Sequence, residues 1–171
     1  NIYLLGVFKM NYSIGDRIVY PMHGAGVITS IETREVMGEM KEYYFLELPY
    51  GSTVLMIPVD GLEANGVRDI IDQNEVPNVL EHFRTSCLEC NSNWNKRQRE
   101  NLERLKSGNI FDVIDVYKAL YIRELDKNLS TGEKKMLTTA RNILFSELML
   151  STGRTEEEVE ELVNNAMGLD D

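Results

Sequence analysis

The spacing of hydrophobic residues divides this chain into a strand-rich first part and a helix-rich second part. In the first part, short runs of β-branched and aromatic residues lie between glycines and prolines. Such runs predict strands, and we place four of them at 16–21, 27–33, 42–48 and 53–59. Several short strands separated by turn residues favour a small antiparallel β barrel or a curled sheet.

Beyond Asp72, apolar residues recur at intervals of three and four, which is the period of an amphipathic helix. Ser130 followed by Glu133 has the spacing of a capping box, and Thr155 followed by Glu158 repeats it. We expect helices over 76–84, 94–106 and 111–126, a fourth from 130 to near 153, and a fifth after 155. The short loops between them favour antiparallel packing in a compact bundle.

Together these elements predict an α+β fold, with a small antiparallel β barrel or sheet followed by a compact helical bundle. We expect a sheet domain over 10–64, a linker over 65–73 and a helical domain over 74–171. The apolar stretch 1–9 is too short for a secretory signal and lacks a cleavage pattern, so we interpret it as an extension before a start at Met10.

The composition is that of a soluble globular protein, since 43% of the 171 residues are hydrophobic and 27% are charged. The two cysteines, Cys87 and Cys90, have C-x-x-C spacing. A redox motif needs a βαβ context and a zinc site needs two more ligands, and the sequence offers neither. We therefore expect ordinary reduced thiols, a cytoplasmic location, and no metal or cofactor. No apolar run approaches the roughly 20 residues that cross a bilayer, so we expect no membrane partner.

The formal net charge is −10, and the strand-rich part is clearly acidic. Between 10 and 64 its cations are Arg17, Arg34 and Lys41, against eight carboxylates: Asp16, Glu32, Glu35, Glu39, Glu42, Glu47, Asp60 and Glu63. Phosphate would repel such a domain, so a protein partner that pairs with an exposed strand edge suits it better than DNA does. The simpler alternative is a solvated acidic surface.

Trp94, the only tryptophan, opens a predicted helix at the head of a basic cluster that contains Lys96, Arg97 and Arg99. An aromatic side chain backed by cations in an acidic protein indicates a stacking or wedging contact with nucleic acid. The alternative is a core tryptophan beside a solvated charged face, because aromatic residues are usually buried. The residues of this segment leave both interpretations open.

Several motifs, in the same order and spacing, resemble the CarD/CdnL family of bacterial transcription regulators. One of them also resembles the polymerase-interacting domain of the transcription-repair coupling factor: Val19-Tyr20-Pro21-Met22-His23-Gly24-Ala25-Gly26. Further motifs in the first part are 31–34, 38–44 and 66–69. The helical part contributes Asn93-Trp94, 101–108, 130–137 and 140–141. The resemblance covers nearly everything from Met10 to about Leu150.

The resemblance implies a Tudor-like N-terminal domain that docks on the β subunit of RNA polymerase. It also implies a helical domain that reaches promoter DNA at the upstream edge of the transcription bubble and stabilises the open complex. The family tryptophan that wedges into the minor groove corresponds to Trp94, and the family's backbone-contacting basic residues correspond to Lys96, Arg97 and Arg99. We expect a monomer.

For polymerase docking, the resemblance points to Arg34 with Val36 close by. Some members carry a second docking arginine where this chain has Met56, so we expect an apolar contact in its place. The alternative function is a protein–protein adaptor on RNA polymerase that makes no direct DNA contact. An enzyme is not expected, because the sequence offers no glycine-rich phosphate loop, nucleophile motif or metal cluster.

Overall fold

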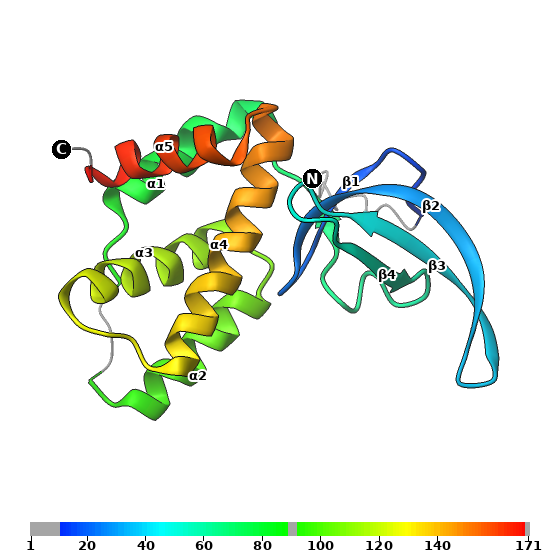
Figure 1. Ribbon diagram of the computed structural model, residues 1–171, viewed down its shortest axis with the longest axis horizontal. Helices are drawn as coiled ribbons and strands as arrows, with labels where there is room; N and C mark the ends of the chain where they lie inside the picture. Colours follow the sequence, from blue (N-terminus) through cyan, green and yellow to red (C-terminus); the bar gives the residue numbers. More distant parts are fainter. Residues whose placement is uncertain (1–10, 89–91, 170–171) are drawn as a thin grey trace, which may run out of the picture.

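The computed structural model describes residues 11–88 and 92–169, so the proposed extension at 1–9 and Cys90 lie outside the described residues. An antiparallel sheet forms one side of the molecule and a group of helices the other, with the long helix α4 nearest the sheet among the helices (Figure 1). This arrangement confirms the α+β class. Within the described ranges, no helix is both long and apolar enough to cross a membrane.

The sheet has five strands in the order β4-β3-β2-β1-β5, and every neighbouring pair is antiparallel. The strands are β1 (Arg17–Tyr20), β2 (Gly24–Val36), β3 (Glu39–Glu47), β4 (Val54–Pro58) and β5 (Arg68–Asp69). Strands β2 and β3 are longer than the sequence predicted and form a hairpin that extends well beyond β4 (Figure 1). Its two turn residues, Met37 and Gly38, both have positive φ, as a tight hairpin turn requires.

The hydrophobic side of the sheet encloses the first of two cores. Its fully buried members include Ile18, Ile28, Leu46 and Ile57, one from each of the strands β1 to β4. Strand β5 lies inside the stretch 65–73 that the sequence indicated as a linker, and it pairs with β1. Two residues are too few to show a strand period, which is why the hydrophobic pattern did not reveal it.

The helices are α1 (Val76–Thr85), α2 (Trp94–Lys106), α3 (Ile110–Asp126), α4 (Thr131–Thr152) and α5 (Glu156–Met167), and a short 3-10 helix η1 (Gln73–Glu75) precedes α1. Both predicted capping boxes are confirmed, at Ser130 with Glu133 and at Thr155 with Glu158. The second hydrophobic core lies among these helices, with Phe83, Ile114, Leu144 and other large side chains fully buried.

The two cores are held together by direct contact between α4 and the start of β2. The Ala25 N–H donates to the Ser146 hydroxyl at 2.8 Å, and the Tyr50 hydroxyl donates to the Asn142 carbonyl at 3.2 Å. A side chain at Gly24 would place its Cβ only 2.7 Å from the Ser146 hydroxyl oxygen. The glycine in the β1–β2 turn therefore permits the close approach of helix and sheet.

Candidate nucleic-acid and protein interfaces

Trp94 is the first residue of α2, and 49% of its surface is exposed. The Asn93 side chain caps the helix by accepting a hydrogen bond from the Lys96 N–H at 3.2 Å. An N-cap of this kind fixes where the helix begins, and it fixes the backbone from which the indole projects. The structure thus favours the exposed interpretation of Trp94 over the core interpretation that the sequence left open.

Arg97 differs from the expectation that it would face DNA. Only 5% of it is exposed, and its guanidinium donates to the Glu133 carboxylate from Nε at 3.3 Å and from Nη2 at 3.1 Å. The α2 residues that face the bundle are Arg97, Asn101 and Leu105, at a helical spacing of four. Arg97 therefore holds α2 against α4, and we leave it out of the proposed DNA-contacting set.

Glu133 serves as the carboxylate of the capping box and as the partner of Arg97. Its second oxygen accepts hydrogen bonds from the Ser130 N–H at 3.0 Å and from the Ser130 hydroxyl at 2.9 Å. The Arg123 Nε lies 3.6 Å from the oxygen that Arg97 contacts. Burial alone would raise the pKa of Glu133, but the hydrogen bonds from Ser130 and Arg97 outweigh it and lower the pKa. The start of α4 and the start of α2 are thus tied through one ionised carboxylate.

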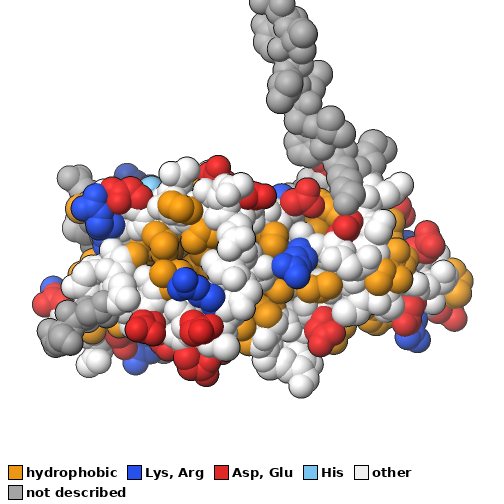
Figure 2. All heavy atoms as spheres, turned by 90° about the horizontal axis from the view of Figure 1, so that it is seen from above, with side chains coloured by type: hydrophobic (Ala, Val, Ile, Leu, Met, Phe, Trp, Pro, Cys, Tyr) orange, Lys and Arg blue, Asp and Glu red, His pale blue; other side chains and the backbone are white. Residues whose placement is uncertain are grey.

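Lys96 and Arg99 remain as exposed cations of the tryptophan helix, and they lie three residues apart on one side of it. Lys96 forms a weak ion pair with Glu100 at 3.9 Å. Several other cations of the helical part are engaged within the fold: Arg104 with Asp115, Lys118 with the Phe83 and Arg84 carbonyls, and Arg141 with Glu156 and Glu160. Figure 2 accordingly shows acidic and basic side chains interspersed over the face that it views.

The three residues expected to dock on polymerase lie on one face of the sheet. Arg34 and Val36 are two residues apart on β2 and therefore point to the same face of the sheet. The pairing of β2 with β3 and of β3 with β4 places Met56 on that face as well. Arg34 contacts the Glu32 carboxylate and lies over the Phe45 ring at 5.6 Å from its centroid. Met56 is opposite Phe45 on the neighbouring strand. We refer to Arg34, Val36, Phe45 and Met56 as the outer sheet face.

Phe45 is the member of the outer sheet face that sequence reasoning missed. The predicted strand 42–48 contained it, but an aromatic residue in a strand is ordinarily assigned to the core. Its link to Arg34 depends on the register of β2 and β3, which shifts between Ile28 and Ser30 because of a bulge. The sequence carries no clear signal for that shift.

Strand β4 forms an edge of the described sheet, because β3 is its single neighbour. It presents Val54, 52% exposed, and Met56, 46% exposed, beside that free edge. An exposed edge strand with accessible apolar side chains can receive a strand from a partner. The predicted edge interaction therefore has a physical counterpart next to the outer sheet face.

The structure describes one of the two cysteines. Cys87 is exposed as a free thiol, and Cys90 falls outside the described residues. In the part of the chain that the structure describes, no three His, Cys, Asp or Glu side chains are grouped as metal ligands would be. The sites that the side chains do form are an exposed indole with two cations and an apolar sheet face with one arginine.

Comparisons with known proteins match the two parts of the chain separately. Residues 12–71 match the CarD-like/TRCF RID domain, which confirms the Tudor-like N-terminal domain, and residues 78–164 match the CarD C-terminal domain. The chain is also 32% identical to "Putative transcription factor YdeB" of Bacillus subtilis (strain 168) over 148 residues, or 86% of this chain and 97% of that relative. On these matches, which confirm the resemblance seen in the motifs, the chain belongs to the CarD family.

Proposed function

We propose that this chain is a non-enzymatic, monomeric transcription regulator of the bacterial cytoplasm. It docks through the outer sheet face on the β subunit of RNA polymerase. It stabilises the promoter open complex by placing Trp94 in the minor groove at the upstream edge of the bubble. The observation that carries this proposal is the half-exposed indole at the start of α2, on a different domain from the docking residues.

On the DNA side, the exposed groups suit a contact that depends little on base sequence. An apolar side chain wedged at a base step must offset an unstacking cost of a few kcal/mol. Lys96 and Arg99 supply phosphate contacts, each of which releases counterions. With a formal net charge of −10, the free protein is repelled by DNA as a whole. Two cations and one indole therefore bind DNA effectively only where another protein holds them beside it and raises their effective concentration.

On the polymerase side, Arg34 can change partners at little cost. Its side chain is 55% exposed and that of Glu32 is 39% exposed, and ion pairs at such sites contribute about 0–1 kcal/mol. Contact with the Phe45 ring restricts the guanidinium before docking, which reduces the entropy lost on binding. Met56 and Val54 add apolar area at the free edge of β4.

The mechanism is a shift of population between closed and open promoter complexes. A factor that contacts the open state better stabilises it by the difference between its two binding free energies. Linked equilibria commonly have couplings of about 1–3 kcal/mol, which would change open-complex stability about 5- to 150-fold. A coupling of that size is what the wedge and the two phosphate contacts would supply.

The wedge is tested by measuring open-complex lifetime on a promoter with Trp94→Ala and Trp94→Phe. We expect Trp94→Ala to remove most of the gain in lifetime and Trp94→Phe, which keeps a flat ring, to retain part of it. Binding of both variants to polymerase should equal that of the wild type. A full gain in lifetime with Trp94→Ala would exclude the wedge.

Docking is tested by the affinity of Arg34→Glu for a fragment of the polymerase β subunit. Thr33→Glu is the matched control, because Thr33 is exposed on the opposite face of β2. We expect Arg34→Glu to weaken binding and Thr33→Glu to leave it nearly unchanged. Equal affinity of Arg34→Glu and the wild type would place Arg34 outside the interface.

The adaptor alternative is distinguished by a DNA footprint on the complete polymerase–promoter complex. Direct contact by the helical domain predicts added protection at the upstream bubble edge that weakens as salt is raised. An adaptor that touches protein alone leaves this footprint unchanged, although the chain still binds polymerase.

A further inference from the structure

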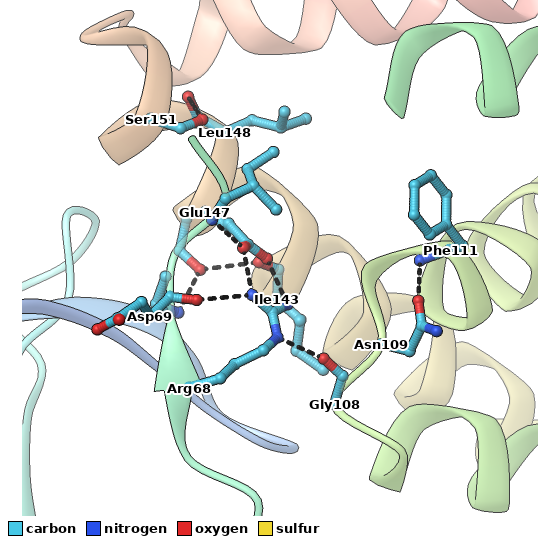
Figure 3. Close-up of polar contacts among 12 residues, drawn as sticks. Arg68, Asp69, Gly108, Asn109, Phe111, Ile143, Glu147, Leu148 and Ser151 are labelled. Carbon is cyan, nitrogen blue, oxygen red and sulfur yellow. Dashed lines mark hydrogen bonds and ion pairs between the residues drawn. The ribbon is translucent and has the colours of Figure 1, made fainter. Parts of the chain in front are cut away.

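Arg68 makes the most extensive polar contact between the sheet and the helices. It belongs to β5, and its Nη1 and Nη2 donate to the two oxygens of the Glu147 carboxylate on α4 at 2.6 and 2.9 Å (Figure 3). Glu147 is completely buried, and it also accepts a hydrogen bond from the Ile71 N–H at 2.9 Å. Parallel hydrogen bonds between a guanidinium and a carboxylate fix orientation as well as distance. One side of Arg68 is therefore locked to α4.

The remaining nitrogen of Arg68 reaches the loop that follows a second helix. Its Nε donates to the Gly108 carbonyl at 2.6 Å, just beyond the C-terminal end of α2 (Figure 3). Gly108 has φ of +73°, and a Cβ there would lie 3.5 Å from the Gly66 carbonyl oxygen and 3.6 Å from the Pro21 ring. The sheet domain thus touches the end of α2 through Arg68 and through close packing. Arg68 thus connects β5, α4 and the loop at the end of α2 at one point.

This connection lies at the opposite end of α2 from Trp94. The helix has 13 residues, which correspond to a length of about 20 Å. Because Arg97 ties the start of α2 to α4, the two helices move together, and a tilt of about 10° between them and the sheet at Arg68 would move the Trp94 end by about 3.4 Å, using that helix length. Successive bases along a strand are also about 3.4 Å apart. A small angular error at Arg68 would thus move the indole by one base step.

We infer that Arg68 is a positioning residue that sets the place of Trp94 relative to the outer sheet face. This inference rests on the proposed function, because it concerns how the docked domain delivers the indole. The bidentate contact with Glu147 fixes the sheet to α4, and the contact with Gly108 fixes the base of α2. Arginine is required because a lysine ammonium cannot bond the two Glu147 oxygens and the Gly108 carbonyl in this geometry.

The test uses Arg68→Lys, which keeps the charge that the buried Glu147 needs. The matched control is Arg17→Lys, because Arg17 also reaches across the domain interface, but its hydrogen bond goes to the Leu150 carbonyl of α4 at 2.7 Å. We expect Arg68→Lys to bind the polymerase β fragment as the wild type does, yet to shorten the open-complex lifetime by about fivefold, the lower end of such couplings. Arg17→Lys should have the wild-type lifetime.

A distance measurement tests the inference without polymerase or DNA. Spin labels at Thr33→Cys on β2 and Asn95→Cys on α2, with Cys87 and Cys90 replaced by serine, report the separation of the two domains. We expect one narrow distance distribution in the otherwise wild-type protein and a broader or displaced one with Arg68→Lys. The same distribution in both proteins would overturn the inference, as would a broad distribution without the Arg68 substitution.

The outcomes separate this inference from the proposed function. If wild-type protein lengthens the open-complex lifetime and Trp94→Ala does not, but Arg68→Lys behaves as the wild type, the positioning role is wrong and the function stands. If the wild-type protein gives no gain in lifetime, the function is wrong, and the distance distributions still decide whether Arg68 orients the domains. Equal loss with Arg17→Lys would indicate general weakening of the interface and would also contradict a specific role.

Discussion

The ion pair between Arg97 and Glu133 yields a quantitative prediction, because both side chains are almost fully buried, with 6% and 4% exposed. Arg97→Ala would leave the Glu133 carboxylate in the interior without its main cation. Breaking a buried pair in this way costs about 3–5 kcal/mol of unfolding free energy. The Ser130 hydrogen bonds and the Arg123 Nε at 3.6 Å remain, so we expect the lower end, about 3 kcal/mol.

In a chain of this length, 1 kcal/mol shifts the midpoint of thermal unfolding by about 2–4 °C. Arg97→Ala should therefore lower that midpoint by about 6–12 °C, as followed by circular dichroism. Lys96→Ala is the matched control, because Lys96 is a neighbouring cation whose ion pair with Glu100 is exposed and 3.9 Å long. Such a pair is worth about 0.3–0.5 kcal/mol, so the control should shift the midpoint by about 2 °C or less.

The same two variants should act in opposite ways on DNA contact. At a temperature where both are folded, Arg97→Ala should keep the salt dependence of the DNA footprint, and Lys96→Ala should reduce it. A loss of stability below about 1 kcal/mol for Arg97→Ala, which is the scale of an exposed pair, would refute the reasoning. It would mean that the guanidinium is not the counter-charge of Glu133.

Three further predictions concern Glu133, Gly24, and Lys96 with Arg99. The folded-state pKa of Glu133 lies below its ordinary value of 4.5. The contribution of the Glu133 carboxylate to stability is therefore present above pH 4.5 and is lost as the pH falls through the folded-state pKa. The difference in unfolding free energy between wild type and Glu133→Gln, measured in denaturant, should shrink below pH 4.5 and stay constant above it. Gly24→Ala should destabilise the protein more than Gly153→Ala in thermal unfolding, because both glycines have positive φ but only the former would put a Cβ 2.7 Å from a hydroxyl of α4; equal losses would mean that backbone strain alone matters. Replacing both Lys96 and Arg99 with alanine should lower the slope of log affinity against log salt, in the polymerase–promoter complex, by about 2, and an unchanged slope would remove them from the interface.

Much of the fold could be predicted from the sequence because local signals coincide with the tertiary structure. The helix that begins at Trp94 and the capping box at Ser130 are set by side chains within four residues of the helix start. The four strands of the predicted sheet likewise carry their own β-branched and aromatic runs. Strand β5 has no such run, and it is a strand because it pairs with β1. Its boundary could not be read from periodicity.

The surroundings of the candidate site residues could not be predicted from the sequence. Trp94 and Lys96 are exposed, whereas Arg97 is buried although all three lie in the same polar-looking segment. The difference arises from Glu133, which is 36 positions away and meets Arg97 only through the packing of α2 on α4. Phe45 likewise joins the outer sheet face through cross-strand register. Long-range pairing of this kind has no local sequence signature.

The hydrogen bond between the Ala25 amide and the Ser146 hydroxyl limits how the two halves can be recombined. A chimera that joins this N-terminal half to the helices of a distant relative would bury a main-chain donor without an acceptor, unless position 146 also supplied one. Grafting therefore succeeds only when the glycine-containing turn and the α4 surface are transferred as a matched pair. The two domains are consecutive in sequence, but the contact between them depends on residues of both.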